Sequence, residues 1–301
     1  MYFNNALEAL GHTPLVELPD IVKNKKVHIL AKLEGQNLGG SASTKDRVAK
    51  YMLDTAVKTG QLNKDKTIIE ATSGNTGISL AWLGKKMGYN VTIVMPENMS
   101  KERQQLIRVF GAELILTEAD KGVLGSMNTV KEMVSKSDKY YMPDQFANPA
   151  NPIAHYETTG VEILDDFPYD KIDYLIAGIG TGGTIVGVTK RLRENFPQVK
   201  TIGVEPPPGD CIQGLRCLET FIPPVLDLSF VSERVCVTST QANEAAKTLL
   251  RTEGIFCGQS SGALIHQAVK IANSIEEGNI VAVLPDGGWK YLSLDFWTKQ
   301  S

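Results

Sequence analysis

Short apolar runs alternate along the chain with segments whose apolar residues recur at helical spacing. The apolar runs predict strands at Val27–Leu33, Thr67–Glu70, Asn90–Pro96, Ala112–Thr117, Tyr174–Gly180, Thr201–Glu205, Val235–Thr238 and Ile280–Pro285. Helices are predicted between them, among others at Gly77–Met87, Lys101–Phe110, Ile185–Arg193, Gln241–Arg251 and Gly262–Ser274. Most strand runs are continuously apolar, which is typical of strands covered on both faces. The pattern therefore predicts an α/β fold with mainly parallel sheets flanked by helices.

Length and charge narrow the class of protein. The chain has 301 residues, which is typical of two lobes or one large α/β unit. Its net charge is −3 with both signs interleaved, so no basic stripe indicates a nucleic-acid partner. The sequence begins without the basic and apolar regions of a signal peptide, and no apolar run approaches the roughly 20 residues that span a bilayer. We therefore expect a cytoplasmic protein that makes no membrane contact.

Cysteine and histidine spacing gives no indication of a metal site. The cysteines are Cys211, Cys217, Cys236 and Cys257, none of them in CxxC spacing. The histidines are scattered, and none lies at a zinc-like distance from a cysteine. We expect reduced thiols and no metal ligands.

Parallel sheets bind ligands at the carboxyl ends of their strands, so the turns that follow the predicted strands are candidate sites. The turn Gly180-Thr181-Gly182-Gly183-Thr184 follows an apolar strand and opens a helix, a combination suited to phosphate. It is not GxGxxG, and no lysine follows it as in a nucleotide P-loop, which disfavours a nucleotide. A merely tight turn is the alternative interpretation.

Two further turns carry polar side chains at predicted helix starts. Thr72-Ser73-Gly74-Asn75-Thr76-Gly77 is rich in hydroxyl groups and suits a carboxylate, although an ordinary N-cap would need only one such residue. Gly258-Gln259-Ser260-Ser261-Gly262 could offer a serine hydroxyl to a ring nitrogen, or could simply cap a helix.

Lys45, in Ser43-Thr44-Lys45-Asp46-Arg47, also stands at a helix start. A helix N-terminus disfavours a cation. A lysine that forms a Schiff base works best with a lowered pKa, so this unfavourable position suits that role. The alternative is a solvated surface lysine.

Together these segments resemble the fold type II family of pyridoxal 5′-phosphate (PLP) enzymes, and within it the cysteine synthases and the catalytic cores of cystathionine β-synthases. The matching motifs run through nearly the whole chain. They are Leu10–Val16, Lys45-Asp46-Arg47, Thr72–Gly77, Met95-Pro96-Glu97, Gln145–Pro152, Gly180–Thr184, Gly254–Gly262 and Tyr291-Leu292-Ser293.

The resemblance implies two lobes with PLP in the cleft between them. It assigns 1–39 and 145–301 to a discontinuous large PLP-binding domain and 40–144 to a small, mobile substrate domain. The resemblance also implies a role for each motif. Lys45 binds PLP covalently and is the catalytic base, Asn75 binds the 3′ oxygen of the cofactor, and Ser260 faces its pyridine nitrogen. The PLP phosphate is held by Gly180, Thr181, Gly182, Gly183 and Thr184. The substrate is bound, mostly through its α-carboxylate, by Thr72, Ser73, Asn75, Thr76 and Gln145.

The activity implied is replacement of the β-substituent of O-acetylserine or O-phosphoserine by sulfide, giving L-cysteine by way of α-aminoacrylate. Three alternatives stay open. One is a relative that consumes cysteine, releasing hydrogen sulfide and forming serine, lanthionine or cystathionine. The others are a threonine or serine dehydratase-like deaminase and a binding protein that keeps the PLP fold without catalysis.

Two details concern the subtype. The stretch Asn37–Thr44 before the lysine is roughly two residues longer than the usual family pattern, so the shape of that loop is not predicted. The segments Gly214-Leu215-Arg216, Phe221–Pro224 and Gly288–Ser293 are similar to those of B-type cysteine synthases. In some such relatives an arginine placed like Arg216 binds phosphoserine and a sulfur-carrier protein supplies sulfur, although Arg216 could also be a solvated surface charge. The family pattern further implies a homodimer.

Overall fold

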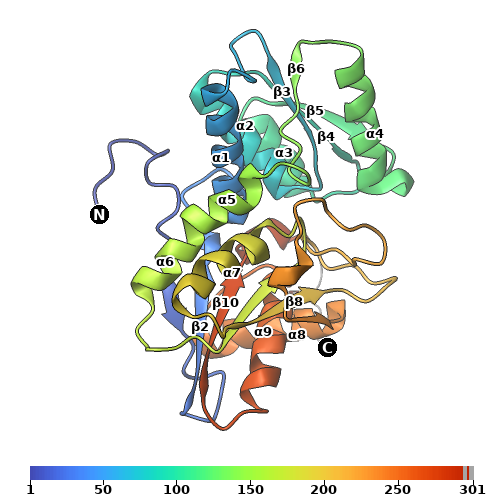
Figure 1. Ribbon diagram of the computed structural model, residues 1–301. Coiled ribbons are helices and arrows are strands. Elements are labelled where there is room, and N and C mark those ends of the chain that lie inside the picture. Colours follow the sequence, from blue (N-terminus) through green and yellow to red (C-terminus); the bar gives the residue numbers. More distant parts are fainter. Residues whose placement is uncertain (294–296, 298–301) are drawn as a thin grey trace.

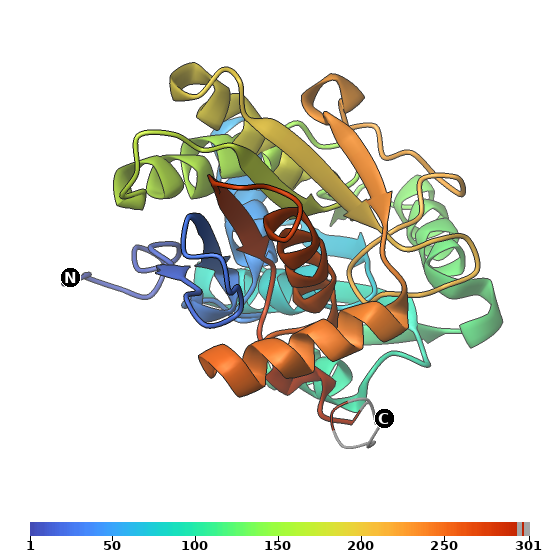
Figure 2. The same ribbon diagram turned by 90° about the horizontal axis from the view of Figure 1, so that it is seen from below.

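The computed structural model describes residues 1–293 and 297, which form two sheets in two lobes, each sheet with its own helices (Figure 1). The small lobe consists of the elements from α1 to β6, and the large lobe of the remaining elements. Both views show the segment before the first strand extending away from the body of the molecule (Figure 1, Figure 2).

The large-lobe sheet has the strand order β1-β2-β10-β7-β8-β9, and all its pairs are parallel except β1 with β2. The strands are β1 (Leu15–Glu17), β2 (Val27–Leu33), β7 (Tyr174–Gly178), β8 (Lys200–Glu205), β9 (Glu233–Cys236) and β10 (Gly278–Leu284). Successive side chains of β10 point to opposite faces: Ile280 and Ala282 pack with one helix layer, Val281 and Val283 with the other. The continuously apolar pattern of this strand follows from burial on both faces.

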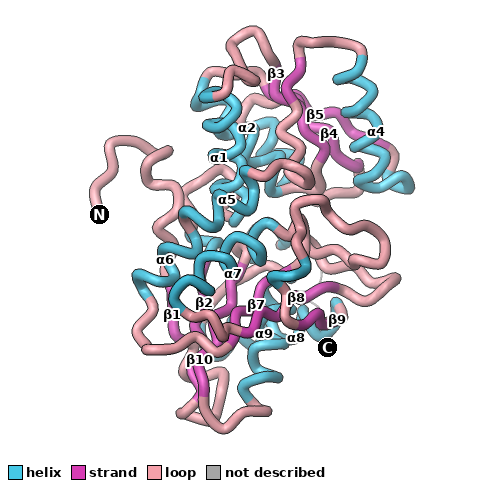
Figure 3. Tube along the Cα trace, in the orientation of Figure 1, coloured by secondary structure: helices cyan, strands magenta, loops and turns pink. Residues whose placement is uncertain are grey.

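The two helix layers of the large lobe are visible in Figure 3. One contains α6 (Thr159–Asp166) and α7 (Gly183–Asn195), and the other α8 (Ser239–Glu253) and α9 (Gln259–Ala272). Helix α5 (Ala150–Glu157) packs on α7 and on α1 of the small lobe, so it joins the two lobes.

The small-lobe sheet is entirely parallel, in the order β5-β4-β3-β6. Its strands are β3 (Thr67–Ala71), β4 (Val91–Pro96), β5 (Glu113–Thr117) and β6 (Tyr140–Tyr141). Helices α1 (Thr44–Lys58), α2 (Asn75–Met87) and α3 (Lys101–Val109) share a core on one face, and α4 (Gly122–Ser135) covers the other. Short 3-10 helices complete the fold: η1 (Glu34–Gln36), η2 (Ala119–Lys121), η3 (Leu228–Phe230) and η4 (Gly288–Tyr291).

The predicted fold class, mainly parallel sheets with helices on both faces, is confirmed. All predicted strands are present with small shifts at their ends, whereas β1, β6, α4, α5 and α6 were not predicted. The two missed strands have only three and two residues, too few to show an apolar run. Within the described part of the chain, no helix has the length and apolar character needed to cross a bilayer.

Candidate active site

A pocket lined by both lobes brings the predicted site residues together. Its wall contains Lys45, Thr72, Ser73, Asn75, Thr76, Gln145, Gly180, Thr181, Gly182, Thr184, Arg216 and Ser260. Gly183, also predicted for the site, is buried and does not line the pocket; a Cβ atom on it would lie 1.8 Å from Asn151 Oδ1. Segments far apart in sequence thus converge at the carboxyl ends of the parallel strands.

Lys45 stands in the first turn of α1. Ser43 caps this helix, and together with Asp46 it forms a capping box, which fixes where the helix begins. Lys45 Nζ donates to Thr44 Oγ1 at 3.0 Å and is partly accessible from the pocket. Burial, reinforced by the charge of Lys290 and opposed by Asp286, lowers the pKa of Lys45. The amine is therefore more easily neutral than an ordinary lysine.

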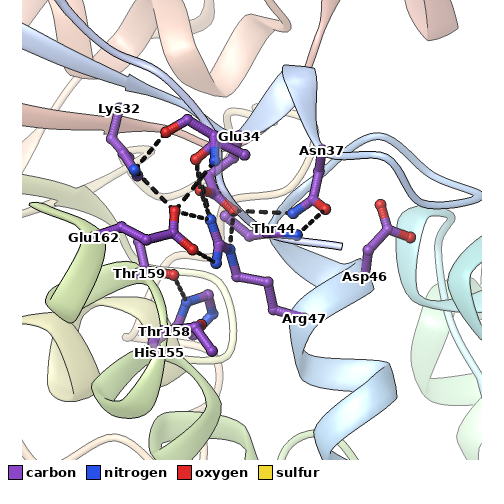
Figure 4. Close-up of polar contacts among 12 residues, drawn as sticks. Lys32, Glu34, Asn37, Thr44, Asp46, Arg47, His155, Thr158, Thr159 and Glu162 are labelled. Carbon is purple, nitrogen blue, oxygen red and sulfur yellow. Dashed lines mark hydrogen bonds and ion pairs between the residues drawn. The ribbon is translucent and has the colours of Figure 1, made fainter. Parts of the chain in front are cut away.

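A polar network behind α1 anchors this helix to the large lobe (Figure 4). Arg47 donates from Nε to Glu34 Oε2 at 2.7 Å and from Nη2 to Glu162 Oε2 at 2.8 Å. Lys32 Nζ pairs with the same Glu162 at 2.9 Å. Burial alone would raise the pKa of Glu162, but the bonds and charges of Arg47 and Lys32 hold that pKa at about 2.

The segment Thr72–Gly77, which we call the carboxylate loop, joins β3 to α2. Thr72 Oγ1 accepts from the Gly74 N–H at 3.1 Å, and Thr76 Oγ1 donates to Gln145 Oε1 at 2.6 Å. Because α2 begins at Asn75, the loop presents unpaired N–H groups and the positive end of the helix dipole to the pocket. Such a loop can bind a small anion, and a carboxylate is the one expected from the sequence.

Asn75 is held by a carboxylate that sequence reasoning missed. Asn75 Nδ2 donates to Asp286 Oδ2 at 2.8 Å, and Tyr291 OH donates to the same oxygen at 2.6 Å. Lys290 forms an ion pair with it at 3.4 Å. Asn75 Oδ1 and Asp286 Oδ1 are buried without a hydrogen-bond partner. Two acceptor atoms of pocket-lining residues thus lack a hydrogen-bond partner within the protein.

The segment Gly180–Thr184, which we call the glycine loop, joins β7 to α7. A Cβ atom at Gly180 would lie 2.6 Å from the carbonyl oxygen of Gly214, and Gly182 has a φ of 90°. Side chains are therefore disfavoured at both positions. The backbone N–H groups at the start of α7 are accessible to an anion.

Two buried residues that sequence reasoning did not single out support the glycine loop. Asn151 Nδ2 donates to Thr181 Oγ1 at 3.0 Å, and His155 Nε2 lies 3.1 Å from Thr184 Oγ1. Burial lowers the pKa of His155, so the imidazole is neutral. Asn151 belongs to the matched segment Gln145–Pro152, which could have indicated it. The Asp286 carboxylate could also have been found, because it follows strand β10 at the same edge of the sheet.

Arg216 and Ser260 lie on different parts of the large-lobe wall. The Arg216 guanidinium lies 5.0 Å from the ring centroid of Phe146 and 5.0 Å from that of Phe221. It is half-buried, burial alone lowers its pKa, and no carboxylate of residues 1–293 pairs with it. Ser260 is buried in the first turn of α9.

Residues before Lys45 in the lengthened loop are held by the large lobe. Lys290 Nζ donates to the carbonyl oxygens of Ser41 and Ala42. Ala42 adopts a φ of 44°, a left-handed conformation that is uncommon for a residue with a side chain.

Comparisons with known proteins agree with this geometry. The family model described as "Pyridoxal-phosphate dependent enzyme" matches residues 6–286. A cysteine synthase of Flavobacterium sp. is 43% identical over 86% of this chain and 85% of its own length. The crystal structure of cysteine synthase from Entamoeba histolytica has a TM-score of 0.93 at 38% identity, covering 100% of this chain and 92% of that one. A hydrogen sulfide-producing enzyme from Fusobacterium nucleatum has a TM-score of 0.91 at 40% identity, covering 97% of this chain and 100% of that one.

The resemblance, the fold type and the cofactor predicted from sequence are confirmed by these matches, and the chain belongs to the family of pyridoxal-phosphate dependent enzymes.

Proposed function

We propose that this chain replaces the β-substituent of an O-activated L-serine with sulfide, giving L-cysteine, with PLP as its cofactor. The observation that carries the proposal is the convergence of Lys45, the carboxylate loop and the glycine loop on one pocket. The cysteine synthase relatives support the same activity.

The residues of the pocket fit PLP. The glycine loop has no room for side chains at Gly180 and Gly183 and ends at a helix N-terminus, which suits the phosphate group. Asn75 has a second amide hydrogen beyond the one given to Asp286, which is available to the 3′ oxygen of the ring. Ser260 offers a neutral hydroxyl to the pyridine nitrogen, and Lys45 offers the amine for covalent attachment.

Bound PLP supplies an electron sink for the substrate Cα. Thr72, Ser73 and Thr76, with Gln145, hold the α-carboxylate and so orient the Cα–H bond. Lys45, whose pKa is lowered by burial, takes the Cα proton as a neutral amine. The leaving group departs with the electron pair of the Cβ–O bond, and sulfide forms the Cβ–S bond. Lys45 then returns the proton to Cα.

The leaving group that the pocket favours is anionic. Arg216 lines the pocket without a carboxylate partner in residues 1–293, so its charge is available to a phosphate. We therefore propose O-phosphoserine as a substrate beside O-acetylserine. A sulfur-carrier protein is the corresponding candidate sulfur donor.

The domain division and the assembly are also proposals. We assign 40–144 to a mobile substrate domain and 1–39 with 145–301 to the PLP-binding domain. The separate cores of the two sheets support this division. We further propose that the enzyme is a cytoplasmic homodimer.

One alternative direction has a specific observation behind it. The Fusobacterium nucleatum neighbour, which is 40% identical to this chain, is described as a hydrogen sulfide-producing enzyme. The same pocket could accept L-cysteine and release its thiol as sulfide.

The test is a comparison of three reactions with the PLP-loaded protein. It is incubated with O-acetyl-L-serine and sulfide, with O-phospho-L-serine and sulfide, and with L-cysteine alone, while cysteine and free sulfide are quantified. We expect cysteine formation from at least one serine ester to exceed sulfide release from cysteine. Faster sulfide release would favour the alternative direction, and no turnover in any mixture would contradict both.

A further inference from the structure

Arg103 is a buried cation of the pocket wall that the proposed mechanism does not use. It comes from α3, is 3% exposed, and extends under the carboxylate loop. Its Nη1 donates to the carbonyl oxygen of Ser73 at 3.2 Å and to Gln213 Oε1 at 2.7 Å. It therefore touches both the loop of the small lobe and the segment of the large lobe that faces it.

The contacts of Arg103 are all with neutral groups. Besides Ser73 and Gln213, the guanidinium lies 4.9 Å from the ring centroid of Tyr291, and its Nε is buried without a hydrogen-bond partner. Within residues 1–293, the hydrogen-bond partners of its guanidinium are neutral oxygens, and no carboxylate oxygen forms an ion pair with it. The carboxylate of Asp286, on the same pocket wall, is already bound by Lys290.

Such an arrangement costs free energy in the absence of a ligand. An ion taken out of water carries a penalty of several kcal/mol unless an opposite charge compensates it. A desolvated charge in a pocket is a candidate functional group for that reason. The partner of Arg103 should accordingly be an anion that enters the pocket.

The position of Arg103 identifies which anion. A Cβ atom on Gly74 would lie 2.6 Å from Arg103 Cδ and 2.8 Å from Nε, so the guanidinium end of the side chain packs directly against the loop backbone. The loop itself offers only neutral donors to a carboxylate. We propose that Arg103, packed against Ser73 and Gly74, supplies the positive charge for the substrate α-carboxylate bound at this loop.

This inference rests on the proposed function, because it takes the loop as the carboxylate site. A charge that acts on the α-carboxylate should distinguish an amino acid from its amide. A merely structural residue would affect both ligands alike. L-Methionine and L-methioninamide are suitable probes, since neither carries an ester leaving group and their binding can be followed without turnover.

The experiment measures the dissociation constants of both probes from the change in the visible absorbance of the PLP-loaded enzyme. The variants are Arg103→Gln and Arg103→Lys, with Arg108→Gln on the exposed face of the same helix as the matched control. We expect Arg103→Gln to weaken L-methionine binding about 10- to 100-fold, as for loss of one interaction with a charged group, and L-methioninamide binding less than about 2-fold. Arg103→Lys should recover most of the loss, and Arg108→Gln should change neither constant.

Equal weakening of both probes by Arg103→Gln or by Arg103→Lys would overturn the inference, and so would an unchanged affinity for L-methionine in Arg103→Gln. If Arg103→Gln does not fold, Arg103→Lys still decides, because it keeps the charge but changes the contacts of the side chain. A wild-type enzyme that binds PLP but responds to neither probe nor to any serine ester would instead contradict the proposed function. A wild type that responds to both probes while Arg103→Gln fails to discriminate would contradict the role of Arg103 alone.

Discussion

Replacing Arg216 with alanine should impair the use of O-phosphoserine far more than the use of O-acetylserine. The guanidinium is held between the rings of Phe146 and Phe221, each at 5.0 Å, so it is pre-oriented at the pocket wall. A phosphate dianion can accept two hydrogen bonds from it, whereas an acetyl ester is neutral.

The magnitude follows from the burial of Arg216. Losing a charged hydrogen-bonded contact costs about 2–4 kcal/mol when the contact is partly buried, or about 30- to 1,000-fold in kcat/KM. A fully exposed contact would be worth less than about 1 kcal/mol. Arg216 is half-buried and desolvation lowers its pKa, so we expect a loss in the lower part of the first range.

The assay is kcat/KM for both esters with sulfide as the second substrate, at low and high ionic strength. Arg216→Lys is the matched variant, because it keeps the charge but loses the planar fork that stacks on the two rings. We expect the ratio of the two esters to fall strongly in Arg216→Ala and less in Arg216→Lys. Equal losses for both esters, or none for either, would refute the reasoning and make Arg216 a packing residue.

Three other substitutions test the rest of the site and its support. Lys45→Ala should abolish turnover and the absorbance of bound PLP; near-normal turnover would place the active lysine elsewhere. Gly183→Ala should lower the affinity for PLP by at least about 10-fold, since its methyl group would meet Asn151, and equilibrium titration with PLP would detect the change. Glu162, whose pKa of about 2 in the folded protein is below the ordinary value of 4.5, stabilises the fold fully above pH 4.5 and loses that contribution as the pH falls towards 2. Glu162→Gln should therefore lower the free energy of unfolding by about 3–5 kcal/mol at pH 7, measured by urea unfolding. It should also flatten the pH dependence of that free energy between pH 4.5 and 2. An unchanged urea midpoint would show that Arg47 and Lys32 do not depend on the Glu162 carboxylate.

The parts of the site that could be predicted from the sequence are the turns whose place in the fold follows from the strand before them. A turn after a parallel strand must lie at the carboxyl edge of the sheet, so the glycine loop and the carboxylate loop could each be recognised as a candidate site from the strand that precedes it. Lys45 could be included because it starts a helix where a cation is unfavourable.

The residues that were missed act through contacts between distant segments. Arg103 looks like an exposed charge on an amphipathic helix until Gln213 and Tyr291 are brought against it. Lys32 and Arg47 likewise look like ordinary surface cations, although both are buried against Glu162. No local pattern distinguishes such a residue from a solvated one, since the distinction depends on tertiary burial.

The two extra residues before Lys45 raised the question of whether the loop reshapes the pocket. The wall of the pocket begins at Thr44, while Ser41 and Ser43 are fully buried and the carbonyl oxygen of Ala42 accepts from Lys290. Ser43 also pairs with Asp286 as an isolated bridge, and the Thr44 N–H donates to the carbonyl oxygen of Pro285. These contacts tie the loop to the segment after β10, and none of residues 37–43 lines the pocket that Arg216 lines. The expected preference for an anionic leaving group therefore rests on Arg216 and not on residues 37–43. The loop instead ties the start of the Lys45 helix to the same Lys290–Asp286 pair that holds Asn75.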